Sequence, residues 1–389
     1  MQKVWSVVKD AVRNIDLVLF ICSVLLSLIS ILTISGSVHN FGMSKLRMQV
    51  FIFIVGTLVT FVVAYVDYRA IIDKLWLPML IGSALLLILT LIVGSSGENM
   101  ETANKSWLGI PGTGLMIQPS EFIKVTFVCT FSKHLFTVRD RINHPLNVLF
   151  LALHAGLIVG LILLSGDLGV ALVYVAMIAI MLFCAGLHPA YFAGAILVIV
   201  LLSPYLWDAL AEYQQMRILV GFNPELDPDF YGHQPLLSRT AIAAGGFFGN
   251  GVRGGSYYEI LAASHTDFIF ATICEKFGFL GGSIVIMIFM VMIVRIIMIA
   301  RSACKTDYGG LICVGVGAIL IVQVLENIGM CLAMLPVVGI TLPFLSCGGS
   351  SMLATFLLFG LLHNIHAHSI GVRNAARMDT LDLDVSLFR

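Results

Sequence analysis

Ten long apolar runs divide this chain, and they constrain its fold more than any other feature. They cover residues 17–35, 48–66, 75–94, 119–136, 146–164, 168–187, 190–206, 268–299, 311–334 and 343–365. A helix needs about 20 apolar residues to cross the hydrocarbon core of a bilayer. Because the runs are continuous and do not alternate in polarity, they indicate helices and not the strands of a membrane barrel. The sequence therefore predicts an all-α polytopic membrane protein with about ten transmembrane helices.

The composition supports the same class. Of 389 residues, 59% are hydrophobic and only 11% are charged, which is more apolar surface than a soluble domain needs. Six of the eight cysteines are expected to be small core residues of the apolar runs and not a disulfide framework: Cys22, Cys129, Cys184, Cys274, Cys313 and Cys331. No CxxC pair or Cys/His spacing predicts a metal site.

The distribution of Lys and Arg predicts the orientation, because positive residues gather on the cytoplasmic side. With the N-terminus inside, the cytoplasmic segments hold fourteen Lys and Arg and the outer segments hold six. We expect one membrane domain over 1–389, with cytoplasmic segments at 1–16 and 367–389. The two largest loops, 95–118 and 207–266, then lie outside, and the second joins spans seven and eight.

Asp267 stands where the long polar segment gives way to the eighth apolar run, within Ser264-His265-Thr266-Asp267-Phe268. A carboxylate at such a boundary is partly desolvated, which raises its pKa and suits it to act as a base. Capping of the helix that begins here explains the residue equally well.

Ionisable residues inside membrane spans suggest function by default. Glu121 and Lys124 lie three apart, so a helix would bring them together, either for function or as an ion pair that fixes packing. Glu275 lies eight residues beyond Asp267 and is expected on the same helix face. Asp167 sits in a tight turn, where capping of the sixth span explains it about as well as function does. Glu326 and Asn327 lie mid-span in the ninth run, and the Glu326 carboxylate needs a partner that the sequence does not identify.

Two glycine-rich stretches stand beside these charges. The run 245–251 could present backbone N–H groups to a phosphate, near Arg217, Arg239 and Arg253, although glycines in loops usually form turns. The run 346–351 opens the last span, where Gly348 and Gly349 could bend the helix or allow close packing.

The chain resembles the SEDS family of ten-span peptidoglycan glycosyltransferases, which includes the RodA, FtsW and SpoVE types. Four stretches carry the likeness: Lys105-Ser106-Trp107-Leu108 through Gln118-Pro119-Ser120-Glu121-Phe122-Ile123-Lys124; Gly232-His233-Gln234 through Gly245-Gly246; His265-Thr266-Asp267-Phe268-Ile269-Phe270-Ala271 through Glu275; and Leu342-Pro343-Phe344 through Gly348-Gly349-Ser350-Ser351.

The resemblance implies a polymerase that joins lipid II into glycan strands at the outer face of the bacterial cytoplasmic membrane. It implies Asp267 as the catalytic residue, a class B penicillin-binding protein and membrane lipid as further partners, and no nucleic acid. A divalent cation is the one cofactor left open. The substrate-binding residues that we predict are Glu121, Lys124, Arg217, Gln234, Arg239, His265, Thr266, Glu275 and Ser350.

The chain also departs from the family pattern. Ala262 and Ala263 stand where the family usually has Pro-Glu, and this family glutamate contributes to activity. A non-catalytic scaffold that recruits a transpeptidase therefore stays an alternative. A lipid II flippase is a third, which the absence of an inverted repeat disfavours. Whether the protein serves elongation, division or sporulation is not encoded in the shared motifs.

Overall fold

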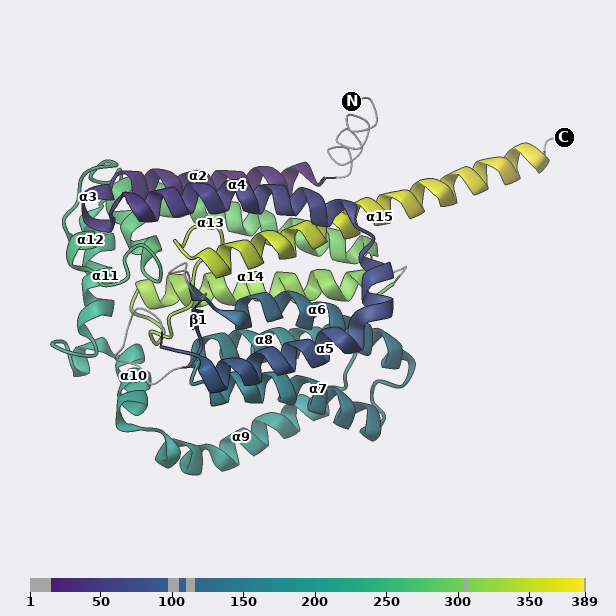
Figure 1. The fold of residues 1–389 in the computed structure, drawn as a ribbon, viewed down its shortest axis with the longest axis horizontal. Helices are drawn as coiled ribbons and strands as arrows, with labels where there is room; N and C mark the ends of the chain where they lie inside the picture. Colours follow the sequence, from purple (N-terminus) through teal and green to yellow (C-terminus); the bar gives the residue numbers. More distant parts are fainter. Residues whose placement is uncertain (1–14, 97–104, 110–115, 304–306, 388–389) are drawn as a thin grey trace.

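The structure is a computed structural model that describes residues 15–96, 105–109, 116–303 and 307–387. The predicted N-terminal segment 1–16 lies almost wholly outside these residues, and the loop 95–118 lies partly outside them. Each of the ten predicted apolar runs corresponds to a long helix, and these helices, apart from α9 at the margin, lie side by side in one bundle (Figure 1). They are α2 Leu17–Ser35, α4 Met43–Tyr65, α5 Tyr68–Val93, α6 Pro119–Val138, α7 Pro145–Leu164, α8 Leu168–Cys184, α9 Pro189–Ala209, α13 Ile269–Ala303, α14 Gly309–Cys331 and α15 Gly349–Leu387.

Seven of the described helices are long and apolar enough to cross a membrane. The other three are α6, which carries Glu121, Lys124 and Lys133, and the shorter apolar stretches of α8 and α9. A bilayer tolerates a charged helix when its charges face the interior of the protein. The prediction of a polytopic helical membrane protein is confirmed.

Short elements connect the long helices. These are α3 Val38–Phe41, the 3-10 helix η1 Arg139–Arg141, α10 Glu212–Phe222, the 3-10 helix η2 Pro224–Leu226, α11 His233–Ala244, α12 Tyr257–Ile260, and the antiparallel strands β1 Leu108–Gly109 and β2 Met116–Ile117. Figure 1 shows α3 and α10–α12 gathered at one end of the bundle, which we call the loop end. The predicted loop 207–266 is thus largely helical.

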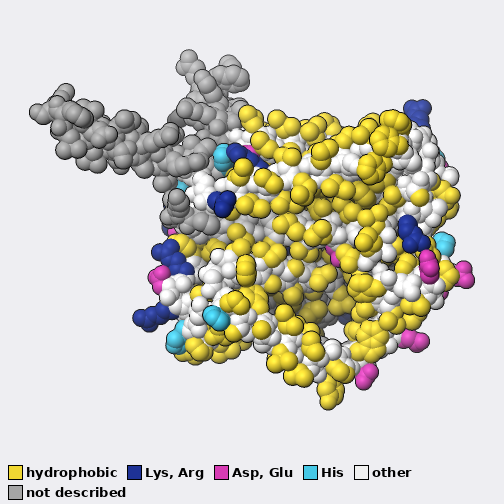
Figure 2. Space-filling view, turned by 180° about the vertical axis from the view of Figure 1, so that it is seen from behind, with side chains coloured by type: hydrophobic (Ala, Val, Ile, Leu, Met, Phe, Trp, Pro, Cys, Tyr) yellow, Lys and Arg dark blue, Asp and Glu magenta, His cyan; other side chains and the backbone are white. Residues whose placement is uncertain are grey.

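Burial separates the central helices from the lipid-facing ones. In the most apolar stretch of α14, 67% of the residues are buried, against 22% in α5. Accordingly α14 packs against α6, α8 and α13, while α5 and α7 present exposed leucines. No described side chain of α9 is buried. Figure 2 shows the outcome: an apolar face with charged side chains gathered toward its two ends.

The last span begins later than predicted. The sequence placed its start at 343, but α15 starts at Gly349 and residues 343–348 form turns. Pro343 cannot donate a helical hydrogen bond, and Phe344 adopts a left-handed φ of 63°. Gly348 and Gly349 therefore mark the start of the helix and do not bend it.

Helix α13 is interrupted near its beginning. Gly278 has φ 68° and ψ −167°, a conformation that glycine adopts without steric cost. This break frees backbone groups on both sides of residue 278 for other hydrogen bonds, and those bonds shape the loop end.

Candidate active site

Asp267 lies in a turn that precedes α13. Ala263 has a left-handed φ of 51°, and its carbonyl accepts hydrogen bonds from Thr266 N at 3.0 Å and Phe268 N at 3.1 Å. The helix begins only at Ile269. The expectation that Asp267 and Glu275 share one helix face is therefore wrong, because Asp267 is not in the helix.

Distant segments hold this turn by its backbone. Asn327 Nδ2, on α14, donates to the Asp267 carbonyl at 2.7 Å and to the Ile340 carbonyl at 2.7 Å. Ser346 Oγ donates to the Thr266 carbonyl at 2.7 Å, and Cys347 N donates to the His265 carbonyl at 2.9 Å. Each of these bonds is accepted by a main-chain carbonyl, so none of them uses the side chain of Asp267.

Asp267 is half-buried, and its carboxyl group lies beside Gly339. Gly339 has φ 72°, and a Cβ built on it would lie 3.4 Å from Asp267 Oδ2. Burial raises the pKa of Asp267 to about 6, and a hydrogen bond from Thr266 opposes that shift. Among the described residues Asp267 has no ion-pair partner that would pull its pKa down. A carboxylate with a pKa near neutrality is suited to general base catalysis.

Glu275 has a different environment. It is fully buried, and its two oxygens accept backbone N–H groups of Ser256 at 2.8 Å, Tyr257 at 2.8 Å and Tyr258 at 2.9 Å. A carboxylate at a helix start satisfies donors that otherwise have no partner. Glu275 thus orders α12, and its effect on the Asp267 turn passes through the backbone.

The glycine-rich run does not form a phosphate cradle, which corrects that expectation. Its N–H groups donate to carbonyls of α13: Asn250 N donates to the Glu275 carbonyl at 3.0 Å and Gly251 N to the Lys276 carbonyl at 2.9 Å. In return, Phe279 N donates to the Gly246 carbonyl at 2.8 Å. The loop pairs with the backbone groups that the break at Gly278 sets free.

The predicted ion pair on α6 is present. Lys124 Nζ lies 2.7 Å from Glu121 Oε2, and both side chains are buried. Beside them, Gln118 joins two other segments: its Nε2 donates to Asp167 Oδ2 at 2.8 Å, and its N donates to Ser350 Oγ at 3.1 Å.

Asp167 caps α8, as one of the two interpretations expected. Its Oδ1 accepts the Val170 N–H at 3.0 Å, while burial raises its pKa and the nearby Glu121 carboxylate adds to that shift. The start of α8 lies against residues 338–340, since a Cβ on Gly169 would lie 2.4 Å from the Val338 carbonyl oxygen. Asp167, which Gln118 joins to the start of α6, and the Asp267 turn therefore lie on either side of the same segment, 338–340.

The remaining predicted residues lie on the helices and turns of the loop end. Arg217, on α10, is exposed and makes no ion pair with a described residue. Arg239, on α11, forms an exposed pair with Glu225 at 3.4 Å. Gln234 Oε1 accepts the Ala262 N–H at 2.8 Å.

His265 and Thr266 belong to the Asp267 turn itself. The His265 ring packs against Phe41, with ring centroids 5.0 Å apart, and Thr266 Oγ1 donates to the Ala263 carbonyl at 3.2 Å. The sequence shows Asn327 as a polar residue inside an apolar run, but it predicts neither the contact of Asn327 with the Asp267 turn nor the position of Gly339 beside Asp267. Glu326 is buried and makes no hydrogen bond or ion pair with a described residue.

Comparisons with known proteins place the chain in a family. The family model of the FtsW, RodA and SpoVE proteins, described as "Cell cycle protein", matches residues 13–370. A probable peptidoglycan glycosyltransferase FtsW of Trichlorobacter lovleyi is 34% identical over 363 residues, which cover 90% of this chain and 93% of that protein. Stage V sporulation protein E of Bacillus subtilis is 32% identical, with 81% and 85% covered.

Solved structures share the fold. A chain from the work "Structural coordination of polymerization and crosslinking by a peptidoglycan synthase complex" is similar with a TM-score of 0.77 and 27% identity, and 91% of this chain and 98% of that chain are covered. The rod shape determining protein RodA of Thermus thermophilus is similar with a TM-score of 0.67 and 24% identity, with 90% and 96% covered.

Proposed function

The chain belongs to the FtsW, RodA and SpoVE family, the SEDS proteins, and on that basis we propose that it is a peptidoglycan glycosyltransferase that polymerises lipid II. The observation that carries the proposal is the half-buried Asp267, whose pKa is raised and whose turn is held through main-chain carbonyls that accept hydrogen bonds from Asn327, Ser346 and Cys347. Relatives that cover most of this chain bear the name peptidoglycan glycosyltransferase.

In the proposed reaction, a sugar hydroxyl of the acceptor attacks the anomeric carbon of the donor. Asp267 accepts the hydroxyl proton, and the bond from the anomeric carbon to the undecaprenyl pyrophosphate breaks. One base is sufficient, since pyrophosphate is a stable anion that leaves without being protonated. General base catalysis of this kind contributes a factor of about 10² to 10⁴ in rate.

Positive charge must meet the departing pyrophosphate. Arg217 fits this role best, because it is exposed at the loop end without an ion-pair partner among the described residues. Lys124 is compensated by Glu121, and Arg239 is shared with Glu225, so both have weaker claims. No three His, Cys, Asp or Glu side chains of the described chain come together as a metal site, so a divalent cation would need phosphate oxygens of the substrate as ligands.

We place the reaction on the outer face of the bacterial cytoplasmic membrane. The excess of Lys and Arg in the predicted cytoplasmic segments supports this orientation, with both termini inside. A class B penicillin-binding protein is the proposed partner, and the similarity to a chain of a peptidoglycan synthase complex supports it.

Polymerisation of purified lipid II by the protein in liposomes, with and without the transpeptidase, tests the proposal. Asp267→Asn should abolish glycan synthesis while the turn persists, because Asn327 and Ser346 bind main-chain carbonyls. Asp229→Asn is the matched control, since Asp229 is an exposed aspartate of the same loop. Glycan synthesis by the Asp267 variant at the control's rate would exclude Asp267 as the base.

A further inference from the structure

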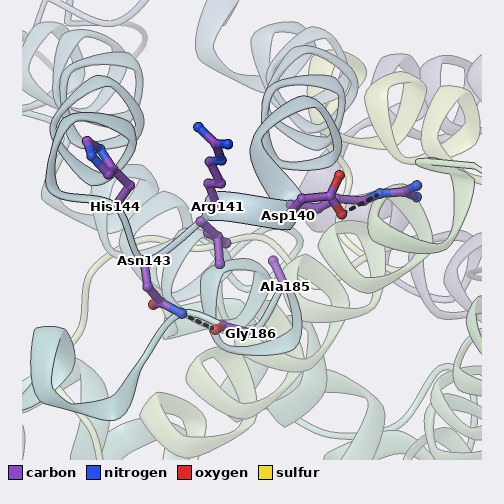
Figure 3. Close-up of a pocket in the computed structure, with 8 residues that line it drawn as sticks. Asp140, Arg141, Asn143, His144, Ala185 and Gly186 are labelled. Atoms are coloured by element: carbon purple, nitrogen blue, oxygen red, sulfur yellow. Dashed lines mark hydrogen bonds and ion pairs between the residues drawn. The ribbon is translucent and has the colours of Figure 1, made fainter.

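A hollow of about 570 Å³ lies at the end of the bundle opposite the loop end. It is formed where α6 turns into α7, through η1, and where α8 turns into α9. Figure 3 shows its lining: Arg139, Asp140, Arg141, Ile142, Asn143, His144, Ala185 and Gly186. Its volume falls within the range of about 300–1,000 Å³ that is typical of small-molecule sites.

Asn143 holds the two walls of this hollow together. Its Nδ2 donates to the Gly186 carbonyl at 3.3 Å, and its Oδ1 accepts the His188 N–H at 2.7 Å. Its carbonyl accepts the Tyr191 hydroxyl at 3.0 Å. The hollow is therefore fixed by hydrogen bonds of one side chain and one peptide group, and it is not a chance gap between two loops.

The charge of the hollow is positive. Figure 3 shows the side chains of Arg141 and His144 pointing the same way. Asp140 instead forms an ion pair with Arg139. The Arg139–Asp140 pair is long, at 3.6 Å, and largely exposed, so it holds Arg139 only weakly. The guanidinium of Arg141 has no ion-pair partner among the described residues. The start of α7 at Pro145 adds the positive end of a 20-residue helix.

An apolar surface continues directly from the positive hollow. On α7 the side chains of Leu146, Phe150 and Leu153 lie on one face, and each is more than half exposed. A ligand that fits both parts has an anionic head and a hydrocarbon tail. Arginine suits a phosphate head, because its planar fork can donate two parallel hydrogen bonds.

We propose that this hollow binds the phosphate headgroup of an anionic membrane phospholipid, with an acyl chain along the exposed face of α7. The site adjoins the start of α9, which the His188 N–H and the Tyr191 hydroxyl tie to Asn143. A bound lipid would therefore fix the start of α9, the helix without any buried described side chain.

Native mass spectrometry of the delipidated full-length protein, titrated with phosphatidylglycerol or phosphatidylcholine, tests the proposal. We expect the wild-type protein to bind one phosphatidylglycerol in preference to phosphatidylcholine. Arg141→Gln should weaken phosphatidylglycerol binding about five-fold, because one basic residue near an anionic headgroup strengthens lipid binding by about that factor. Arg141→Glu should weaken it further, and neither change should affect phosphatidylcholine.

Arg301→Gln is the matched control, because Arg301 is an exposed arginine of the last turn of α13 and does not line the hollow. It should bind phosphatidylglycerol like the wild-type protein. Equal loss in the Arg301 and Arg141 variants would show a general attraction of surface charge and overturn the site. Displacement of the lipid by the same concentration of inorganic phosphate would overturn the lipid assignment in favour of a soluble anion.

Discussion

Glu275→Gln should loosen the segment that leads into Asp267, although it changes a single oxygen to an NH₂ group. The two oxygens of Glu275 accept three backbone N–H groups, those of residues 256–258. A glutamine offers one oxygen, so its NH₂ must face a backbone N–H. Two donors then meet in a fully buried place, since Glu275 is 0% exposed.

The magnitude follows from the number of bonds. A hydrogen bond to a charged group contributes about 1.5–3 kcal/mol, and a buried donor left without a partner costs about 1–3 kcal/mol. Losing at least one such bond should therefore destabilise α12 by about 2–4 kcal/mol, which is roughly a 30- to 700-fold increase in its local opening. The effect reaches the Asp267 turn because Ser264 Oγ donates to the Tyr258 carbonyl at 2.8 Å.

Hydrogen exchange of the purified protein, followed by mass spectrometry of peptides that cover 250–268, measures this opening. Glu259→Gln is the matched control, because Glu259 lies in α12, the short helix that Glu275 orders, but its side chain pairs with His39 at the surface. Exchange should accelerate in the Glu275 variant and stay near the wild-type rate in the control. Equal exchange in all three proteins would refute the assignment of Glu275 to ordering this segment.

Three further predictions concern the same site. Asn327→Leu removes two hydrogen bonds and should lower stability by about 2 kcal/mol, measurable as a lower Tm, together with the rate of lipid II polymerisation. The polymerisation rate of the wild-type protein should fall as the pH drops through about 6, because burial raises the pKa of Asp267 to about 6 and a base must be ionised to act; a rate that is flat from pH 7 to pH 5 would contradict this. Arg217→Gln should raise KM for lipid II about ten-fold or more, whereas Arg239→Gln, whose arginine sits in an exposed pair with Glu225, should change it by less than about two-fold.

The number and order of the long helices could be predicted from the sequence, because lipid demands long continuous apolar runs. The Glu121–Lys124 pair was predictable for a similar reason, since residues three apart on a helix are neighbours. Both predictions depend only on residues that are close together in the sequence, and not on which distant segments pack against each other.

The break in α13 could not be predicted, because glycine is common inside membrane helices and does not by itself interrupt them. What makes Gly278 a break is the run 245–251, whose backbone supplies partners on both sides of it. Likewise, Asn327 lies 60 residues from Asp267 in sequence, and only the packing of α14 beside the Asp267 turn reveals their contact.

By the family resemblance, Ala262 and Ala263 stand where relatives usually have Pro-Glu. Hydrogen bonds show how this chain holds its backbone at the two positions. A proline at 262 would fix the backbone but would have no N–H to donate. Here the Ala262 N–H donates to Gln234 Oε1 at 2.8 Å, so α11 fixes the same point by a hydrogen bond. The left-handed conformation of Ala263 costs about 1–3 kcal/mol of free energy. Its carbonyl accepts hydrogen bonds from the N–H groups of Thr266 and Phe268. Hydrogen bonds therefore fix the turn at both positions in this chain. Since the resemblance implies a carboxylate at 263, we expect a difference from relatives in chemistry and not in folding.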